Sequence, residues 1–243
     1  MKAFVPAAGV GSRLRPLTDK TPKALIPVAG VAAIERVISR LRAAGADSFV
    51  VNAHHHAAKV AEFCAELSRR VGAPIAVSRE DELLLDTGGG LKKAAPLLRG
   101  SQAFFMHNAD ILTDLDLRAL YAAHARSGAL ATLAVARGAG ARAYLFDAHG
   151  RLVGHDDRGN TTWARGPVPG ARRLHFDGVH AISPELLDRI TESGVFSITK
   201  TYLRLAAEGA DIRAWSAEPR AWHDIGTPEN LRAAERWAAS AGG

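Results

Sequence analysis

The chain has 243 residues, of which 47% are hydrophobic and 23% are charged. This composition is typical of a folded globular protein and excludes an extensively disordered chain. No apolar run reaches the roughly 18 residues that a membrane-spanning helix needs. The first residues, MKAFVPAAGVGSR, lack the long apolar core of a secretory signal. These features predict a cytoplasmic protein that does not enter a membrane.

The net charge of +6 fits an acidic ligand, either a polyphosphate or a nucleic acid, but most of these charges are better explained by a generally arginine-rich surface. Its basic residues are scattered, and no basic run is interleaved with aromatic residues, so a nucleic-acid partner is not expected. The single cysteine, Cys64, excludes a disulfide framework. Because Cys64 shares one face of a predicted helix with Val60 and Leu67, we expect a small core residue and not a catalytic thiol.

Strand-like and helix-like segments alternate through the first half of the chain. The apolar runs KAFVPA, SFVVNA, PIAVSRE and QAFFMHNAD read as strands. Helical periodicity or turn signals place helices at 31–44, around Cys64 and at 115–127. Such alternation predicts an α/β fold, with a Rossmann-like, mainly parallel sheet covered by helices.

The pattern changes after residue 140. AYLFDAHGRLVG predicts a hairpin that turns near Asp147, and residues 158–173 read as an exposed excursion. LHFDGVHAI is strand-like, and helices are predicted from Pro184, at 198–208 and at 228–240. Since no linker is recognisable, we expect a single domain over 1–243. Its nucleotide-binding half would span 1–140 and its smaller substrate-binding half 141–243.

The segment AAGVGSRLRPLTDKTPKALIPVAG, residues 7–30, carries the most information about function. Gly9 and Gly11 allow the backbone to approach a ligand closely, and Arg13 and Lys23 add positive charge beside that turn. A P-loop pattern is absent, and Leu14 stands where the dinucleotide-binding fingerprint requires glycine. A dinucleotide-dependent oxidoreductase therefore loses its main support.

The arrangement A-A-G-x-G-S-R-L-x-P-L-T-x-x-x-P-K-x-L-x-P-V resembles the signature of the sugar nucleotidylyltransferase family. That family includes mannose-1-phosphate guanylyltransferases and muramate-1-phosphate uridylyltransferases. Three further segments, HNADILTD, FDGVHAISPELL and WHDIGTPENL, resemble other family motifs, and DTGGGLKKA at 86–94 resembles its second glycine loop. The resemblance implies the nucleotide-diphospho-sugar transferase fold and the joining of an NTP to a sugar 1-phosphate with release of pyrophosphate.

The resemblance also implies roles for individual residues. The expected catalytic residues are Arg13, Lys23, Asp110 and Asp224, of which Asp110 and Asp224 would hold Mg²⁺. The expected nucleotide contacts are Ala7, Ala8, Gly9, Gly11, Ser12, Arg13, Asp86, Thr87, Gly88 and Gly89. The expected sugar contacts are Asn108, Gly178 and His180.

Several alternatives stay open at this point. The leading substrate pairs are GTP with mannose 1-phosphate and UTP with a muramate-type sugar phosphate. A non-catalytic nucleotide-sugar sensor on the same fold is the rival from another class. His107 and His180 could each contact the sugar or be satisfied within their strands. The consecutive residues His54–His56 do not have the spacing of a zinc site.

Overall fold

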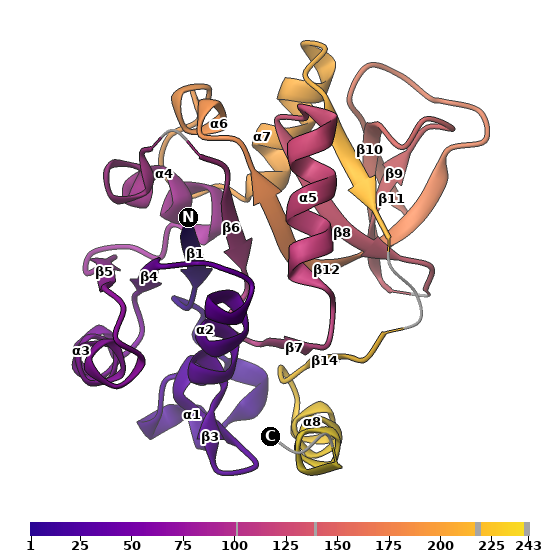
Figure 1. Ribbon diagram of the computed structural model, residues 1–243. Helices are drawn as coiled ribbons and strands as arrows, with labels where there is room; N and C mark the ends of the chain where they lie inside the picture. The colour runs from indigo at the N-terminus through magenta and orange to yellow at the C-terminus, as the bar shows by residue number, and fades with distance from the viewer. Residues whose placement is uncertain (101, 139, 217–219, 241–243) are drawn as a thin grey trace.

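The computed structural model describes residues 1–100, 102–138, 140–216 and 220–240. Within these ranges one large sheet dominates the molecule (Figure 1). Its strands are β1 (Lys2–Pro6), β4 (Ser48–Ala53), β5 (Ile75–Arg79), β6 (Phe104–His107), β8 (Ala131–Ala136), β9 (Arg142–Phe146), β10 (Leu152–Asp157), β11 (Asn160–Trp163), β12 (Arg172–Ile182) and β13 (Ile212–Trp215). The order is β11-β10-β9-β12-β6-β1-β4-β5, with β8 joined to β12 and to β13.

Two short strand pairs lie outside the large sheet. They are β2 (Pro27–Val28) with β3 (Val31–Ala32), and β7 (Ile111–Thr113) with β14 (Trp222–Asp224). The helices are η1 (Ser12–Leu14), α1 (Leu17–Lys20), η2 (Lys23–Leu25), α2 (Ala33–Ala43), α3 (Ala57–Val71), α4 (Asp86–Leu98), α5 (Leu117–Ser127), α6 (Glu185–Asp188), α7 (Ile198–Ala207) and α8 (Pro228–Ser240).

Strand β1 lies in the middle of the sheet and is buried on both faces. It pairs in parallel with β4 on one side and with β6 on the other. Ala3 and Val5 pack into one core layer and Phe4 into the other, all 0% exposed. The buried part of a parallel strand covered on both sides must be apolar, which explains the residues Ala3–Val5. The predicted α/β fold is confirmed.

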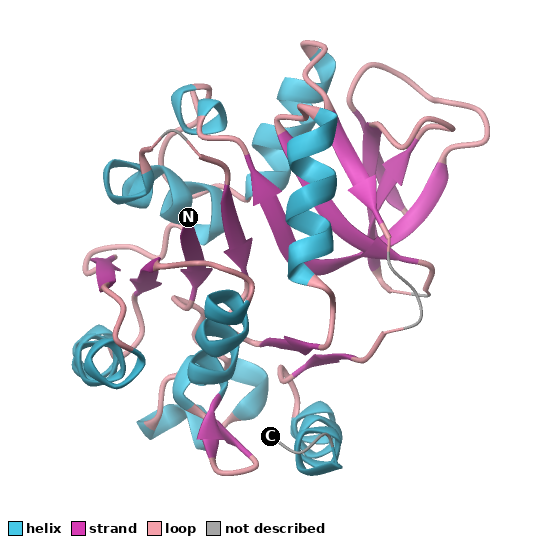
Figure 2. Cartoon of the chain, viewed as in Figure 1, coloured by secondary structure: helices cyan, strands magenta, loops and turns pink. Residues whose placement is uncertain are grey.

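Helices cover both faces of the sheet (Figure 2). One core layer contains buried side chains of α2, α3, α5 and α8, and the other contains side chains of α4, α6 and α7. Cys64 is 0% exposed within the first layer, and burial raises the pKa of its thiol to about 12. The prediction of a core cysteine is confirmed.

Helix α5, predicted at 115–127, begins two residues later at Leu117 and ends at Ser127. The Asp116 side chain accepts a hydrogen bond from the Ala119 N–H at 2.9 Å, which satisfies one free donor of the first turn. Gly128 caps the end of the helix, and its φ of 62° lies in the left-handed region that glycine adopts without steric cost.

The second half of the sheet is antiparallel around β12. Strands β9 and β10 form the predicted hairpin, with a turn at Asp147. The segment at 158–173 has no buried residue, in line with the exposed excursion expected from its Gly, Pro and Arg content, but part of it is regular. It contains β11, which pairs antiparallel with β10 after a turn at Arg158 and Gly159. Strand pairing supplies the order that composition did not reveal.

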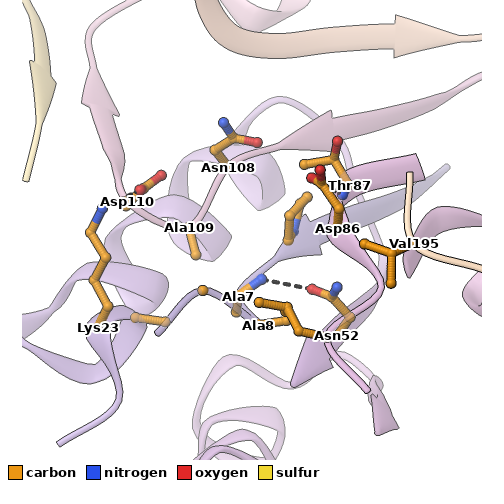
Figure 3. Close-up of a pocket in the computed structure, with 14 residues that line it drawn as sticks. Ala7, Ala8, Lys23, Asn52, Asp86, Thr87, Asn108, Ala109, Asp110 and Val195 are labelled. Atoms are coloured by element: carbon orange, nitrogen blue, oxygen red, sulfur yellow. Dashed lines mark hydrogen bonds and ion pairs between the residues drawn. The ribbon is translucent and has the colours of Figure 1, made fainter. Parts of the chain in front are cut away.

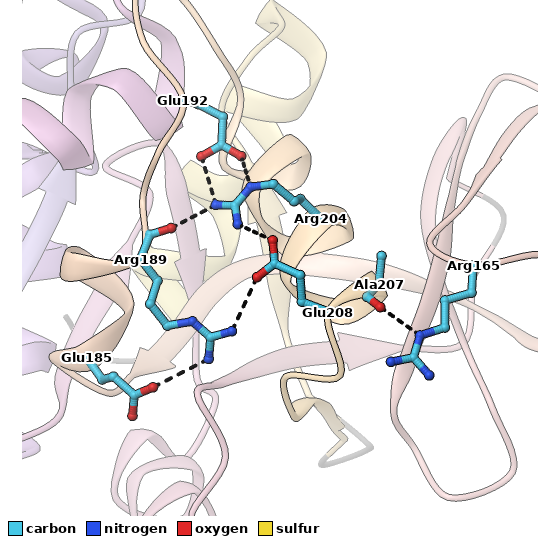
Figure 4. Close-up of polar contacts among 7 residues, drawn as sticks. All are labelled: Arg165, Glu185, Arg189, Glu192, Arg204, Ala207 and Glu208. Atoms are coloured by element: carbon cyan, nitrogen blue, oxygen red, sulfur yellow. Dashed lines mark hydrogen bonds and ion pairs between the residues drawn. The ribbon is translucent and has the colours of Figure 1, made fainter.

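An ion-pair network around Arg204 of α7 holds the segment that joins α6 to α7 against that helix (Figure 4). Arg204 Nε lies 2.8 Å from Glu192 Oε1, and Arg204 Nη1 lies 2.7 Å from Glu208 Oε1. Arg204 Nη2 also donates to the carbonyl oxygen of Arg189 at 2.7 Å. The Glu192 side chain is only 5% exposed, so this part of the network is shielded from solvent. Beyond this segment, Gly194 and Phe196 lie against α4, and Val195, Ser197 and Ile198 line the cavities described below.

Candidate active site

The carboxyl ends of β1, β4 and β6 open into a cavity of about 370 Å³ (Figure 3). Ala7 follows β1, Asn52 lies near the end of β4, and Asn108 follows β6. This edge of a parallel sheet is the usual ligand side, because the loops that leave it form a crevice. The other lining residues are Pro6, Ala8, Gly9, Lys23, Ala24, Leu84, Asp86, Thr87, Ala109, Asp110 and Val195.

The loop after β1 presents Ala7, Ala8 and Gly9 to this cavity. Gly11 has a φ of 68°, and a Cβ added there would lie 2.8 Å from Thr18 Cγ2. The Thr18 hydroxyl donates to the carbonyl oxygen of Gly11 at 2.9 Å. Gly11 therefore shapes the turn, which any other residue would strain and crowd.

A buried chain of hydrogen bonds connects this loop to the start of α4. The Ala7 N–H donates to Asn52 Oδ1 at 2.7 Å, and Asn52 Nδ2 donates to Glu80 Oε1 at 2.6 Å. Glu80 Oε2 accepts from the Leu85 N–H at 2.9 Å. Asn52 is 2% exposed and Glu80 is 1% exposed. Because every step pairs a donor with an acceptor, the chain holds both segments in place.

The expectation of a glycine loop at 86–94 was wrong, because these residues form the first turns of α4. A Cβ at Gly88 would lie 2.5 Å from the Phe196 ring, and one at Gly89 would lie 2.7 Å from the carbonyl oxygen of Gly194. A Cβ at Gly90 would lie 2.6 Å from Asn52 Nδ2. The glycines let the helix pack closely against its neighbours, while Asp86 and Thr87 line the cavity.

Pairing of β7 with β14 brings two aspartates together. Asp224 lies opposite Ile111, and the Ile225 N–H donates to the carbonyl oxygen of Asp110 at 3.0 Å. The Lys23 ammonium bonds the Asp110 carboxylate and lies 3.6 Å from Asp224 Oδ1. All four residues predicted to be catalytic meet here, because Arg13 Nη2 lies 4.0 Å from Asp224 Oδ2.

The two carboxylates fit a hard divalent cation. Mg²⁺ is commonly held by one or two protein carboxylates, and phosphate and water oxygens complete its octahedron. Asp110 and Asp224 supply such oxygens at the cavity edge, and the nearby Lys23 shows that this point attracts positive charge. Gly226 leaves room there, since a Cβ would lie 2.8 Å from Asp224 Oδ1 and 2.7 Å from Arg13 Nη2.

A second cavity of about 240 Å³ adjoins the first, and Thr87 and Asn108 line both. Its remaining wall comes from the second half of the chain and from β6: Met106, Arg142, Ala143, Tyr144, His155, His175, Phe176, His180, Ser197, Ile198 and Thr199. Burial lowers the pKa of His155 and lowers that of His180 to about 3, so both are neutral at pH 7. Together with Tyr144, Ser197 and Thr199 they give the wall several uncharged hydrogen-bonding groups beside the charged Arg142.

The two histidines left open by the sequence lie on opposite faces of the sheet. His180 pairs with Met106 and lines the second cavity. His107 pairs with Val179 and lines a separate hollow with Arg40 and Trp237. Its pKa is lowered to about 4, mainly by burial. His107 therefore does not lie on the face that holds the second cavity.

The predicted contacts divide into lining and supporting residues. Those that line a cavity are Ala7, Ala8, Gly9, Asp86, Thr87, Asn108 and His180. Those not among the described lining residues are Gly11, Ser12, Arg13, Gly88, Gly89 and Gly178. Gly178 has a φ of 78°, and a Cβ there would lie 3.1 Å from Asn108 Nδ2, so it makes room for Asn108.

Sequence reasoning missed Asn52, Glu80, Tyr144, His155 and His175. Asn52 did carry a signal, since it is the one amide within the mainly apolar strand SFVVNA. The others come from strands or strand ends that no recognised motif marks. The side chains of His54–His56 contact the carbonyl oxygens of Glu80, Thr18 and Asp19, and thus pack the neighbouring segments together.

The fold and this site define a nucleotidyltransferase: an α/β sheet, a cavity at its carboxyl edge and a Lys–Asp–Asp cluster. The sequence profile of the nucleotidyl transferase family matches residues 2–145. The chain belongs to this family, and it is a sugar-1-phosphate nucleotidylyltransferase. In the ranges that the structure describes, no helix has the length and apolarity to cross a bilayer.

Relatives of known function support this assignment. The chain is 34% identical to the N-acetylmuramate α-1-phosphate uridylyltransferase of Neisseria meningitidis, with 98% of each chain covered. It is 33% identical to the enzyme of the same name from Caulobacter vibrioides, covering 98% of this chain and 97% of that one. Identity to the mannose-1-phosphate guanylyltransferase of Mycobacterium tuberculosis is 28%, over 94% of this chain and 62% of the relative.

Solved structures share the fold at lower identity. The UDP-glucose pyrophosphorylase of Acinetobacter baumannii has a TM-score of 0.79 at 18% identity, covering 97% of this chain and 92% of that one. The inositol-1-phosphate CTP transferase of T. maritima has a TM-score of 0.76 at 16% identity, covering 98% and 94%.

Proposed function

We propose that this protein joins UTP to N-acetylmuramate 1-phosphate and releases pyrophosphate. The observation that carries the proposal is the end-to-end match to two uridylyltransferases of that substrate, at 97–98% of their length. The guanylyltransferase relative extends well beyond the match, which covers 62% of its chain. GTP with mannose 1-phosphate is therefore the second candidate. A cytoplasmic location follows as part of the proposal, because NTP is supplied there.

We propose that the two halves of the chain bind different substrates. Residues 1–140 would hold the nucleotide in the first cavity, through the loop after β1 and through Asp86 and Thr87. Residues 141–243 would form most of the sugar site in the second cavity, together with Asn108. Asn108 lies at the junction, where an amide can both donate to and accept from sugar hydroxyls.

The reaction needs alignment and charge stabilisation more than proton transfer. A phosphate monoester has a second pKa of about 6, so the attacking oxygen of the sugar phosphate is ionised at neutral pH. That oxygen forms a bond to the α-phosphorus of the nucleotide, while the bond to the β-phosphate breaks and its electron pair leaves with pyrophosphate. Lys23 and Arg13 offset the repulsion between the two polyanions.

Asp110 and Asp224 would hold Mg²⁺ in this proposal. When bound, the ion supplies charge neutralisation at the phosphates. The protein residues then have separate tasks. The two carboxylates would hold the ion in place and Lys23 would balance the remaining negative charge, while the Gly226 N–H donates to Asp224 Oδ1 at 2.7 Å.

A substrate matrix tests the proposal. Pyrophosphate release would be measured with ATP, GTP, CTP, UTP and dTTP against the 1-phosphates of N-acetylmuramate, N-acetylglucosamine, mannose and glucose, with and without Mg²⁺. We expect the highest kcat/KM with UTP and N-acetylmuramate 1-phosphate, and no turnover without a divalent cation. A higher value with GTP and mannose 1-phosphate would replace this proposal with the second candidate.

A charge variant tests the site within the same assay. Lys23→Gln should lower kcat by about tenfold or more, because a cation that faces the reacting phosphates is lost. Lys93→Gln is the matched control, since Lys93 is an exposed lysine of α4 outside both cavities. Equal rates for the two variants would show that the phosphate site lies elsewhere. Nucleotide binding without turnover across the whole matrix would instead favour the sensor.

A further inference from the structure

A buried tyrosine contacts the histidine that lines the second cavity. The Tyr202 hydroxyl of α7 lies 2.9 Å from His180 Nδ1 of β12. Tyr202 is 0% exposed and His180 is 1% exposed. The His180 ring also packs edge-on against Phe176, with centroids 4.5 Å apart, so its orientation is held from two sides. This inference rests on the proposed function, which assigns the second cavity to the sugar.

Counting protons defines the tautomer of His180. Burial raises the pKa of Tyr202 well above its usual value, so the phenol keeps its proton. In the described part of the chain, that hydroxyl has no hydrogen-bond partner other than His180 Nδ1. A buried O–H must donate to something, and a neutral imidazole has one bare nitrogen. Nδ1 therefore accepts from Tyr202, and the ring hydrogen is on Nε2.

The Nε2–H of His180 has no protein acceptor within the described residues, while the ring lines the cavity. We propose that Tyr202 is a positioning residue, which fixes His180 as an Nε2–H donor to an acceptor oxygen of the bound sugar. A sugar that lacks an oxygen at this position would leave the donor unpaired, and sites of this kind discriminate strongly against such analogues.

His107 provides an internal reference with the opposite tautomer. Its Nδ1 lies 2.9 Å from the carbonyl oxygen of Asn108, which can only accept, so Nδ1 carries the hydrogen. Its Nε2 is buried and has no partner among the described residues. The two histidines should therefore give opposite patterns in the nitrogen spectrum of one sample.

Nitrogen NMR of the ¹⁵N-histidine-labelled full chain tests the tautomer directly. We expect a protonated-type Nε2 and a bare-type Nδ1 for His180, and the reverse for His107. Tyr202→Phe should convert the His180 signals to a tautomer mixture and leave those of His107 unchanged. Adding N-acetylmuramate 1-phosphate should shift Nε2 of His180 only. A hydrogen found on Nδ1 of His180 in the wild-type protein would overturn the proposal.

Two substitutions at His180 separate its two nitrogens. In His180→Gln the side-chain amide nitrogen takes the place of Nε2, so an N–H donor toward the cavity is kept. In His180→Asn the amide nitrogen takes the place of Nδ1, so the donor toward the cavity is lost. We expect KM for the sugar phosphate to stay within about threefold of wild type in the Gln variant and to rise about ten- to a hundredfold in the Asn variant. The KM for UTP should be unchanged in both.

Equal sugar KM values for the Gln and Asn variants would contradict the donor role. The outcome is separable from failure of the proposed function. If the wild-type chain gives no pyrophosphate with UTP and N-acetylmuramate 1-phosphate, the proposed function fails. The tautomer and its response to added sugar 1-phosphates would still decide the inference, because neither measurement needs turnover.

Discussion

Gly90→Ala tests whether the glycines of α4 serve close packing. An added Cβ would lie 2.6 Å from Asn52 Nδ2 and 2.8 Å from Glu80 Oε1, both of them nearly fully buried. Real Cβ atoms do not approach polar atoms so closely, so Asn52 must move. Its displacement breaks the bond to Glu80 and the bond that holds the Ala7 N–H. One methyl group on α4 would thus disturb the loop after β1.

The size of the effect follows from three contributions. Overpacking of a tight interior costs about 1–3 kcal/mol, and each lost buried hydrogen bond costs about 1 kcal/mol. Replacing glycine by alanine within a helix returns about 1 kcal/mol. We therefore expect the free energy of unfolding to fall by about 2–4 kcal/mol. KM for UTP should also rise by about tenfold, because the first loop loses its anchor.

Urea unfolding and steady-state kinetics measure these two effects. Gly166→Ala is the matched control, because no atom lies within 4 Å of its added Cβ. The control should change neither the free energy of unfolding nor KM for UTP. The packing argument is refuted if Gly90→Ala is as stable as the wild-type protein and binds UTP equally well.

Three further predictions concern other parts of the molecule. Asp110→Asn and Asp224→Asn should each lower turnover about a hundredfold and raise the Mg²⁺ concentration needed, and the double variant should lose less than the product of the single losses. Asp188→Asn, at an exposed residue of α6, is the control. A folded single variant with normal Mg²⁺ dependence would contradict the shared site. Cys64→Ala should keep its turnover but lose about 1 kcal/mol of stability in urea unfolding, because it leaves a small core void; a folded but inactive variant would be inconsistent with this. Burial lowers the pKa of His124 from 6.5 to about 4, so the unfolded chain binds more protons between these values. Stability should be complete above pH 6.5 and fall as the pH drops toward 4, and His124→Gln should flatten that decline by up to about 1.4 kcal/mol per pH unit. If His124→Gln leaves the pH dependence of the free energy of unfolding unchanged across this range, His124 does not cause the decline.

The sequence by itself determined much of the fold and the residue types of the site. The apolar run of β1, the Asp116 cap and Gly128 are local signals, and each acts on the chain within a few residues of itself. The loop after β1 could be predicted for a related reason. Glycine permits the close approach of a ligand and fixed cations favour phosphates, so the types and spacing of Gly9, Arg13 and Lys23 predict a phosphate site.

The family resemblance already joined Asp110 and Asp224 as expected metal ligands, but only the tertiary structure shows how distant residues are brought together and which way their side chains face. Asp110 and Asp224 come together because β7 pairs with β14, and His180 faces the second cavity because of its register against β6. A shift of one residue in strand register would turn each side chain to the other face, and a periodicity in the sequence does not specify that register. The same holds for Gly90, whose role follows from Asn52, a residue on another strand that packing alone brings within reach.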